Sequence, residues 1–437
     1  MTYKETINYL YNSTPVFEKS GAGAYKEGLH NTHALDAYFQ HPHRHYKTIH
    51  VAGTNGKGSC SHTIAAILQA AGYKTGLYTS PHLVDFRERI RIDGKPVSEK
   101  YVVDFVEKHR AFFEPLHPSF FELTTAMAFK YFEDEKVDVA VIEVGLGGRL
   151  DCTNVISPDL CVITNISFDH TQLLGHTLAA IAGEKAGIIK PHTPVVIGET
   201  VSETRPVFEQ KAKAMDAPVI FAEEERLLHS YTEKDGRFVY RTRFYPSIEG
   251  ELTGLCQIYN TNTILSAIRQ LVSLGYRIPD KAVLKGFSHV CELTGLMGRW
   301  QTIRHSPLVI CDTGHNVGGF EYISKQIRNV KCKQLRIVIG MVDDKDYTEV
   351  LAMLPSTAVY YFTQADNKRA VPVDLFYSTA RKSGLEGKCF PTVKEAYKAA
   401  LQDADRDDFI FVGGSSYIVA DFLQFLKEQS DKISFMP

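Results

Sequence analysis

The sequence has no C-x-x-C pair, no apolar run long enough to cross a bilayer and almost no net charge. Its eight cysteines are scattered, which fits reduced thiols in a cytosolic protein better than a disulfide framework or a zinc site. The formal net charge of -2 gives no reason to expect a nucleic-acid partner. The first residues, MTYKETINYL, lack the apolar core of a signal peptide, so we expect a soluble cytoplasmic protein that needs no membrane.

A glycine-rich stretch, residues 50–59 (HVAGTNGKGS), stands between two regular patterns. Residues 48–52 are typical of a buried strand, and residues 63–68 begin a helical pattern. Glycines let the backbone fold tightly so that several N–H groups point at one anion, and a helix N-terminus adds partial positive charge. Because Lys57 can reach the terminal phosphates and Ser59 can reach a metal, the stretch predicts a nucleotide phosphate site.

This stretch departs from the standard P-loop pattern at two places. Val51 stands where that pattern has its first glycine, and Gly58 stands where it has Ser or Thr directly after the lysine. The alternative is an ordinary glycine turn between a strand and a helix. The presence of Lys57 and Ser59 beside both elements favours phosphate binding.

Strands alternate with helices over residues 47–200, which predicts βαβ units and a mostly parallel sheet. Lys234-Asp235-Gly236 lies between apolar runs and predicts a hairpin, and the alternation restarts after a boundary near residues 295–300. We therefore expect an α/β protein with an N-terminal P-loop-like ATPase domain, residues 1–296, and a smaller C-terminal Rossmann-like domain, residues 297–437. The expected strands cover residues 48–52, 75–80, 137–144, 160–166, 195–198, 308–311, 336–340, 358–362 and 409–412.

Helix signals accompany these strands. Ser98 is placed to cap a helix that runs to about Phe113, and Ser119 with Glu122 has the spacing of a capping box. Further helices are expected over residues 177–189, 257–274 and 416–426.

Three ionisable residues lie at the end of a predicted strand, just after one, or within a predicted helix. In open α/β sheets, ligands bind at the C-terminal ends of the strands. Glu143 ends an apolar strand, where a carboxylate is costly unless it is paired or holds a metal, and we favour a magnesium ligand over a buried ion pair. His170 follows the next strand, and a ligand and a structural histidine are equally open. Composition alone makes Lys185 a solvated helix lysine.

Three histidines, His41, His43 and His45, alternate in a polar segment near the N-terminus. Such a run can bind a metal. No carboxylate or cysteine joins it in the sequence, so we predict a solvated loop.

Taken together, the motifs resemble those of the folylpolyglutamate synthase and dihydrofolate synthase family, within the Mur-type amide ligases. The resemblance covers most of the chain, and the combination of motifs is highly specific although no single motif is. The matching motifs are HVAGTNGKGS (50–59), SPHL (80–83), FE (121–122), EVGLGGRLDCTN (143–154), DH (169–170), EKAGIIK (184–190), Asn260, GR (298–299), DTGHN (312–316) and GSSY (414–417).

The resemblance implies roles for the matching residues. The nucleotide would be bound by Gly53, Thr54, Asn55, Gly56, Lys57, Gly58, Ser59, Asn260, Arg299 and Asp312. The metal ligands would be Ser59, Ser80, Glu143, His170 and Lys185, with Lys185 carbamylated into a metal-binding anion. The pterin substrate would contact Phe121, Glu122, Leu150, Asp151 and Cys152. The catalytic residues would be Lys57, Lys185 and His315.

The family reaction is ATP-dependent amide formation. Transfer of the γ-phosphoryl group makes an acyl phosphate, which the amine of L-glutamate then attacks. The expected substrates are dihydropteroate or reduced folates, or both, together with L-glutamate and ATP. The expected cofactor is Mg²⁺ at two sites, with a monovalent cation as a further candidate, and we expect a monomer.

Three other functions compete with this one. A cell-wall UDP-muramyl amino acid ligase is disfavoured by the GKGS and LGGRLD stretches. A small-molecule kinase would leave phosphate on its product, and a non-catalytic nucleotide-binding module would turn nothing over. Four departures from the family pattern, at Cys152, Cys256, Met297 and Thr313-Gly314, bear on the shape of the substrate pocket but leave the charged residues in place.

Overall fold

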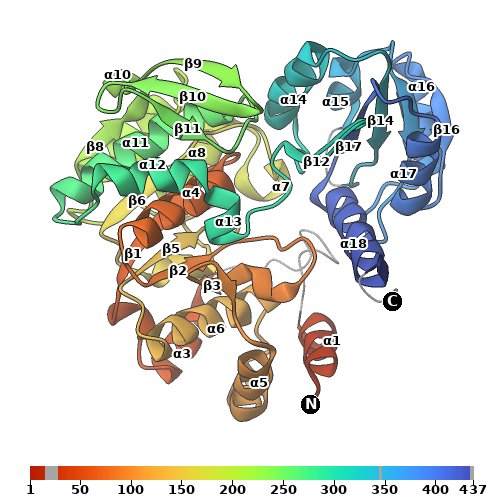
Figure 1. Ribbon diagram of the computed structural model, residues 1–437. Helices are drawn as coiled ribbons and strands as arrows, with labels where there is room; N and C mark the ends of the chain where they lie inside the picture. Colours follow the sequence, from red (N-terminus) through yellow and green to blue (C-terminus); the bar gives the residue numbers. More distant parts are fainter. Residues whose placement is uncertain (15–27, 344–346, 434–437) are drawn as a thin grey trace. The chain divides into compact units, whose positions relative to one another are not determined.

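The computed structural model of the chain describes residues 1–14, 28–343 and 347–433 (Figure 1). The chain divides into two compact units. The first unit comprises Met1–His82, Phe86–Thr253 and Gln257–Leu296, and the second comprises Leu83–Asp85, Gly254–Cys256 and Met297–Pro437. Each unit contains a large, mostly parallel sheet with helices on both faces, which confirms the predicted α/β class.

The main sheet of the first unit has eight strands in the order β4-β3-β2-β5-β1-β6-β7-β8. They are β1 (Lys47–Ala52), β2 (Thr75–Tyr78), β3 (Ile90–Ile92), β4 (Lys95–Pro96), β5 (Val139–Glu143), β6 (Leu160–Ile163), β7 (Val195–Ile197) and β8 (Val219–Phe221). The pairs from β2 across to β8 are parallel, and β3 and β4 are added antiparallel at one edge. All the strands predicted over residues 47–200 are present, and the predictions missed β3, β4 and β8.

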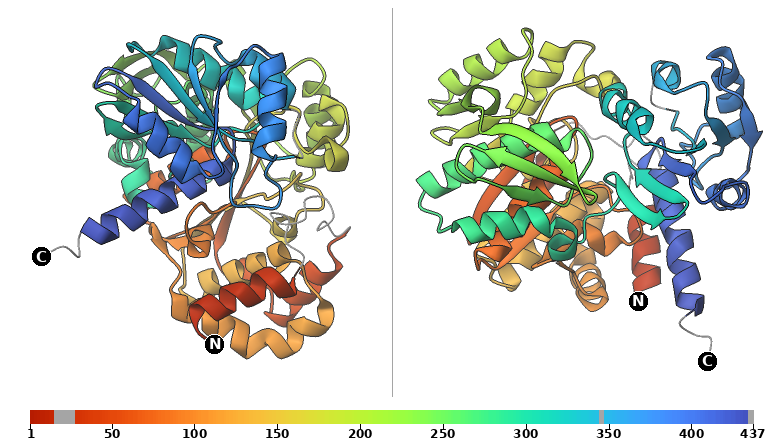
Figure 2. Two further views of the ribbon diagram at one scale, coloured as in Figure 1. Left: turned by 90° about the vertical axis from the view of Figure 1, so that its right-hand side faces the viewer. Right: turned by 45° about the horizontal axis from the view of Figure 1, so that its top comes forward.

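Helices cover both faces of this sheet because its strands are buried on both sides. On one face α4 (Lys57–Ala70) and α11 (Gln257–Ser273) lie on the strands, with α12 (Asp280–Ser288) and α13 (Val290–Thr294) against α4. On the other face one apolar core joins α6 (Phe120–Asp134) to the strands and to α1 (Tyr3–Ser13), α3 (His30–Tyr38) and α5 (Glu99–Phe113) (Figures 1 and 2). A second core on that face contains α8 (Leu178–Ala186) and α9 (Arg205–Ala214).

The helix starts follow local capping chemistry. The Ser119 side chain accepts from the Glu122 N–H and the Glu122 carboxylate accepts from the Ser119 N–H, so the predicted capping box is present at the start of α6. Ser98 caps α5 as predicted. The helix expected from about residue 63 begins earlier, at Lys57, because Gly56 adopts a left-handed φ of 83° and its carbonyl accepts from Cys60 N. Lys57 and Ser59 therefore lie in the first turn of α4.

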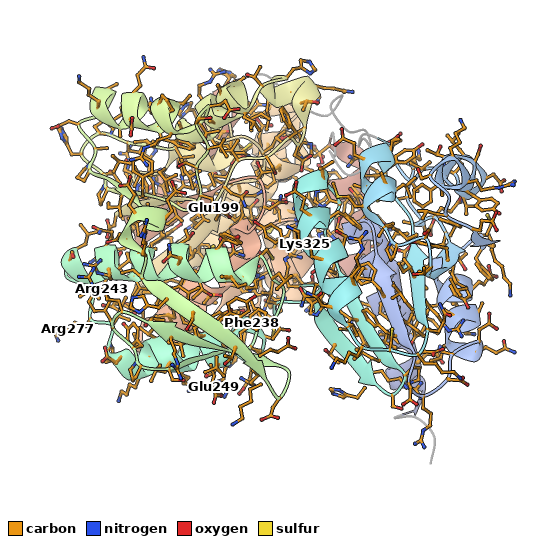
Figure 3. All side chains as sticks on the ribbon, turned by 90° about the horizontal axis from the view of Figure 1, so that it is seen from above. Glu199, Phe238, Arg243, Glu249, Arg277 and Lys325 are labelled. Carbon is orange, nitrogen blue, oxygen red and sulfur yellow. The ribbon has the colours of Figure 1, made fainter. Side chains whose placement is uncertain are left out.

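A small antiparallel sheet completes the first unit, with β9 (Leu228–Lys234), β10 (Arg237–Thr242) and β11 (Ile248–Gly250). The two-residue turn Asp235-Gly236 has φ values of 52° and 70°, which the right-handed twist of a hairpin favours, and the predicted hairpin is confirmed. Phe238, labelled in Figure 3, is buried on the β10 strand.

The His-rich run is not the predicted solvated loop. His43 is only 6% exposed, and the carboxylate of Asp36 on α3 lies against both His41 and His43. The sequence separates Asp36 from these histidines, so the prediction failed because the chain folds back after α3.

The second unit has a six-stranded sheet in the order β12-β13-β17-β14-β15-β16. The strands are β12 (Gln301–His305), β13 (Leu308–Asp312), β14 (Leu335–Ile339), β15 (Val359–Phe362), β16 (Gly387–Cys389) and β17 (Phe409–Gly413), with only β12 antiparallel. One face is covered by α14 (Val317–Asn329), α15 (Tyr347–Met353) and α16 (Val373–Lys382), and the other by α17 (Val393–Gln402) and α18 (Ser416–Ile433). The four predicted strands of this unit are confirmed. Among the helices of the described residues, none is both long and apolar enough to span a membrane.

Candidate functional site

The loop between β1 and α4 is held by the residues that follow β6. Thr54 N donates to the carbonyl of Asn165 at 2.9 Å, and Asn55 N donates to the Asn165 side-chain oxygen at 2.9 Å. The Thr164 hydroxyl donates to the Asn55 carbonyl at 2.5 Å. Residues 164–166 were predicted as the end of a strand, but they leave the sheet because the polar groups of Thr164 and Asn165 bind this loop.

Two glycines of the loop are required by close approach as well as by conformation. Gly53 has φ 143°, and a Cβ there would lie 1.9 Å from Thr164 Oγ1. Gly56 has φ 83°, and a Cβ there would lie 2.3 Å from Asn260 Oδ1. The loop backbone therefore lies directly against Thr164, just after β6, and against α11, and side chains at these positions would force it away from both.

We expect Gly53→Ala to lower the free energy of unfolding by about 3 kcal/mol and to weaken ATP binding, because it combines backbone strain with displacement of the loop. Gly72→Ala is the matched control, since Gly72 has a φ of 94° but nothing lies within 4 Å of its added Cβ. That change should cost only about 1 kcal/mol and leave ATP affinity unaltered. Urea unfolding and ATP titration of both variants measure the difference, and equal effects would contradict the role given to the loop.

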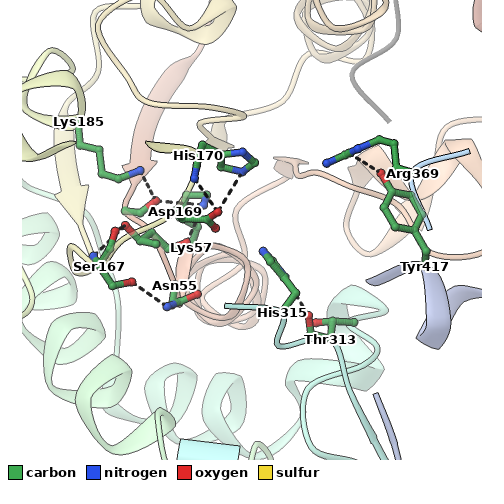
Figure 4. A network of polar contacts seen from close by, with 12 residues as sticks. Asn55, Lys57, Ser167, Asp169, His170, Lys185, Thr313, His315, Arg369 and Tyr417 are labelled. Carbon is green, nitrogen blue, oxygen red and sulfur yellow. Dashed lines mark hydrogen bonds and ion pairs between the residues drawn. The ribbon is translucent and has the colours of Figure 1, made fainter. Parts of the chain in front are cut away.

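Two lysines converge on one carbonyl of this loop (Figure 4). Lys57 Nζ donates to Gly53 O and to Thr54 O, both at 3.0 Å, and Lys185 Nζ donates to Gly53 O at 2.9 Å. Lys185 is only 4% exposed, so its composition-based assignment as a solvated lysine is wrong. Burial and the nearby charge of Lys57 lower the pKa of Lys185 to about 7, although Asp169 and Asp151 oppose the shift. A substantial fraction of this amine is therefore neutral at physiological pH.

Asp169 and His170 follow β6, as do Thr164 and Asn165, which hold the loop. His170 has a left-handed φ of 49° and begins the short helix α7 (Thr171–Leu174). Its N–H donates to Asp169 Oδ1 at 2.8 Å, and its Nε2 lies 3.7 Å from the same oxygen. Ser167 binds Asn55 and Thr54, so the segment after β6 contacts the loop through several side chains (Figure 4).

Glu143 ends β5 beside the loop-bearing strand, in register with Val51 of β1. Its side chain is buried, and Glu143 Oε2 accepts from the N–H of Ser80 at 3.1 Å. The structure thus brings together two of the predicted metal ligands, from the ends of neighbouring strands β2 and β5. An anionic carboxylate at this depth requires compensating charge, which fits a divalent cation.

Ser59 lies in the first turn of α4 and is buried against α11. Gln257 Nε2 donates to Ser59 Oγ at 3.1 Å, and Asn260 Nδ2 donates to Gln257 Oε1 at 3.0 Å. This chain of amides fixes the hydroxyl that was predicted to reach a metal. Sequence reasoning did not single out Gln257 as a site residue.

Glu199 is a second residue that the predictions missed. It follows β7 and is labelled in Figure 3. Its N–H donates to the Thr164 carbonyl at 3.0 Å, and its carboxyl is hydrogen-bonded to Asn165. Burial raises the pKa of Glu199 to about 7, despite that hydrogen bond. Its position directly after a strand was the available signal, because the C-terminal ends of parallel strands share one edge of the sheet.

The predicted pterin-binding residues lie at the start of α6 and in the loop after β5. Phe121 packs against this loop so closely that a Cβ at Gly145 would lie 2.4 Å from its ring. Asp151 is buried and accepts from Leu146 N at 2.8 Å and from Thr153 N at 3.0 Å, so it organises the loop. Burial raises the pKa of Asp151, and these hydrogen bonds oppose the rise.

The remaining members of this group divide between buried and half-buried positions. Glu122 is buried, and its carboxylate accepts a hydrogen bond of 2.6 Å from Ser119 N. Leu150 and Cys152 are half-buried. Burial raises the pKa of the Cys152 thiol, which keeps it protonated.

In the second unit, the predicted residues gather at the end of β13. Asp312 accepts from Trp300 N at 2.7 Å and from Gly314 N at 2.8 Å, and burial raises its pKa against the opposing charge of Arg299. Arg299 donates to Thr313 Oγ1 and to the Gly298 carbonyl. The side chains of Arg299 and Asp312 are thus fixed within one unit.

His315 lies two residues further on, before α14. Its Nδ1 lies 3.1 Å from the Thr313 carbonyl, which can only accept, so Nδ1 carries the proton of the neutral ring and Nε2 bears the lone pair (Figure 4). Elsewhere in the second unit, Arg369 donates to the Tyr417 hydroxyl at 3.1 Å. Tyr417 belongs to the GSSY stretch, whereas Arg369 was not predicted.

Two domain families of the Mur ligases match this chain, one in each part. The Mur ligase middle domain matches residues 51–263, and the glutamate ligase domain of the Mur ligases matches residues 298–416. A folylpolyglutamate synthase of Lacticaseibacillus casei is 32% identical over 441 residues, covering 96% of this chain and 97% of that protein. A dihydrofolate synthase/folylpolyglutamate synthase of Escherichia coli (strain K12) is 34% identical over 382 residues, covering 86% of this chain and 85% of that protein.

Solved structures agree over almost the whole length. The structure of E. coli FolC in complex with DHPP and ADP is similar with a TM-score of 0.83 and 29% identity, covering 98% of this chain and 99% of that one. The bifunctional folylpolyglutamate synthase/dihydrofolate synthase of Yersinia pestis, complexed with AMPPNP and Mn ion, has a TM-score of 0.83 and 28% identity, covering 98% of each chain.

Proposed function

This chain belongs to the folylpolyglutamate synthase/dihydrofolate synthase family of the Mur ligases, and from that premise we propose that it is an ATP-dependent amide ligase. It adds L-glutamate to dihydropteroate, to the glutamate tail of reduced folates, or to both. The observation that carries this proposal is the loop at residues 53–59, in which Gly53 and Gly56 admit no Cβ and to which two lysines donate.

The loop suits the triphosphate of ATP. Its backbone is held from outside by Asn165 and Thr164, and α4 begins at Lys57, so the N-terminal N–H groups of the helix lie beside the loop. Asn260, which a Cβ at Gly56 would contact, adds an amide at the same place. We include Arg299 and Asp312 of the second unit as further nucleotide contacts.

The buried carboxylate of Glu143 fits a divalent cation, and Ser59, Ser80, His170 and Lys185 complete the proposed ligand set over two magnesium sites. When bound, Mg²⁺ would neutralise phosphate charge and stabilise the charge that develops during phosphoryl transfer. Lys185 would serve as a ligand after carbamylation. Its neutral amine attacks CO₂, an N–C bond forms and one proton leaves to solvent, which turns a cation into an anion.

The chemistry follows from activation of a poor electrophile. The pterin carboxylate attacks the γ-phosphorus of ATP, ADP leaves, and an acyl phosphate forms. The amine of L-glutamate then attacks the acyl carbon, and phosphate leaves with the bonding pair. Lys57 offsets the repulsion between the carboxylate and the triphosphate, both of which are anions. Phe121, Glu122, Leu150, Asp151 and Cys152 are the proposed pterin contacts, and His315 is proposed to lie close to the reacting groups.

Phosphate release with purified protein, ATP and Mg²⁺ tests this function. Release should require both L-glutamate and a pterin acid, either dihydropteroate or tetrahydrofolate, and mass analysis should show a gain of one glutamate residue. A product that gains phosphate instead would identify a kinase. Release with a muramyl nucleotide and an amino acid would identify a cell-wall ligase. Parallel rates with the two pterin acids decide the balance of the two activities.

Further features of the proposal concern organisation. We assign ATP binding to residues 1–296 and the C-terminal ligase domain to residues 297–437, and we propose a monomer in the cytoplasm. None of the eight cysteines, all of which lie in the described residues, forms a disulfide bond, which supports a reducing compartment. A monovalent cation is a further candidate ligand.

A further inference from the structure

Asp36, His41 and His43 form a cluster in the first unit, away from the residues of the proposed nucleotide site in sequence and in element. His41 Nδ1 lies 2.5 Å from Asp36 Oδ2, and His43 Nε2 lies 3.3 Å from Asp36 Oδ1. One ligand atom from each of the three residues lies within 4.8 Å of the other two. The proposed amide ligase activity uses none of them.

The fold brings these residues together at the C-terminal end of α3. The chain turns through two left-handed residues, Gln40 and His41, with φ values of 61° and 59°. The turn is closed by a hydrogen bond of 2.8 Å from His41 N to the carbonyl of Asp36. A short 3₁₀ helix, η2 (Pro42–Arg44), then places His43 against α6, where its ring centroid lies 5.9 Å from that of Phe129.

Two atoms of the cluster are buried without a hydrogen bond. Asp36 is 9% exposed and His43 is 6% exposed. Neither Asp36 Oδ1 nor His43 Nε2 has a hydrogen-bond partner within the described residues, because their mutual contact lacks hydrogen-bond geometry. Buried polar atoms are nearly always satisfied, and one that is not requires an explanation such as an ion.

The donor set suits a transition metal. Imidazole nitrogen and carboxylate oxygen are ligands that zinc accepts, about 2.0 to 2.2 Å from the ion. Two ligands of a tetrahedral zinc ion at such distances lie about 3.3 Å apart, which matches the separation of His43 Nε2 and Asp36 Oδ1.

We propose that Asp36, His41 and His43 bind one zinc ion, which links the end of α3 to the segment leading into β1. Binding through Nδ1 requires the ring proton of His41 on Nε2, so the Nδ1 contact with Asp36 Oδ2 gives way to the metal–nitrogen bond. The side chain of His41 is 38% exposed, so water can supply a fourth ligand from that side. The site is structural, because it ties η2 to the end of α3, whose Leu35 lies in the apolar core around α6.

The third histidine of the run provides a matched control. His45 Nδ1 lies 2.5 Å from Glu133 Oε1 at the end of α6, and its side chain is 58% exposed. It therefore belongs to a separate surface ion pair. His45→Ala removes a histidine from the same short segment and leaves the proposed ligands in place.

Zinc titration of the full chain, by calorimetry in excess Mg²⁺, tests the site. Wild type should bind one equivalent that Asp36→Asn and His41→Asn each weaken at least about tenfold, since even the loss of an indirect supporting contact at a metal site costs 10- to 100-fold. His45→Ala should stay within about twofold of wild type. Asparagine tolerates the left-handed backbone of His41, so this variant should fold. Circular dichroism of each variant without metal establishes that it does.

Two other readouts bear on the same site. At zinc concentrations about 100 times the dissociation constant, the thermal midpoint of wild type should rise by about 3 °C, and that of Asp36→Asn should not. Cobalt substitution should give the intense visible absorption of a four-coordinate ion. Zinc binding that is equal in wild type and Asp36→Asn, or that His45→Ala abolishes, overturns the proposal, as does the absence of binding by wild type.

Discussion

Lys57→Ala is expected to lower kcat at least about 1,000-fold, which corresponds to about 4 kcal/mol of lost transition-state stabilisation. Lys57 stands in the first turn of α4, and its ammonium lies 3.0 Å from the carbonyls of Gly53 and Thr54. No other lysine of the loop can replace it, because residues 53–59 contain only this one. Phosphate release under saturating ATP, L-glutamate and pterin acid measures kcat directly.

A surface lysine serves as the control for this change. Lys100 on α5 is 81% exposed and forms an ion pair with the exposed Asp104 one turn further along the helix. Lys100→Ala should therefore keep wild-type turnover. Lys57→Arg tests geometry against charge, since a guanidinium keeps the charge but not the shape of an ammonium. Wild-type turnover in Lys57→Ala would remove the loop from the mechanism.

Lys185→Met should abolish most of the activity, by at least about 100-fold, while it stabilises the fold near neutral pH. The activity is lost because methionine can neither be carbamylated nor bind Mg²⁺. Burial lowers the pKa of Lys185 from 10.5 to about 7, so holding the charged ammonium in the folded state costs free energy near neutral pH. Methionine carries no charge and removes this cost. Turnover assays and urea unfolding measure the two effects on the same variant.

The sign of the pH dependence follows from linkage. Between about pH 7 and 10.5 the unfolded chain keeps the proton of Lys185 and the folded chain has lost it, so this group makes stability rise with pH. The rise is at most about 1.4 kcal/mol per pH unit, and it is lost as the pH falls to about 7. The difference in unfolding free energy between wild type and Lys185→Met, measured in CO₂-free buffer, should therefore shrink across this range. A pH-independent difference would contradict the burial of an ionisable amine.

Carbamylation has its own readout. Enzyme freed of CO₂ should be less active, and at a fixed concentration of dissolved CO₂ activity should return faster as the pH rises through 7, because only the neutral amine reacts. A carbamate signal from ¹³C-labelled bicarbonate should appear in wild type and be missing in Lys185→Met. Activity that does not respond to CO₂ removal would leave Lys185 without this role, while the Lys57 prediction would stand.

The strands that carry the proposed site were accessible from the sequence because they are continuous apolar runs. Val139–Glu143 and Leu160–Ile163 are buried on both faces, and such runs are recognised without knowledge of their partners. The edge strands β3 and β4 were missed because they are only three and two residues long, and their pairing depends on neighbours distant in the chain. Residues 164–166 were predicted as strand because Ile166 follows the apolar run closely, whereas the polar groups of Thr164 and Asn165 bind the loop at Thr54 and Asn55.

The sequence by itself determined the α/β class, the glycine-rich loop with Lys57 between a strand and a helix, and the family, since these depend on local pattern and on motifs in fixed order. Tertiary structure alone decided the states of Lys185 and of the Asp36–His43 cluster. A lysine on a helix is solvated or buried according to what packs over it, and here it is buried with its amine on Gly53 O. Asp36 meets His41 and His43 only because two left-handed residues reverse the chain after α3, and no period in the sequence records that turn.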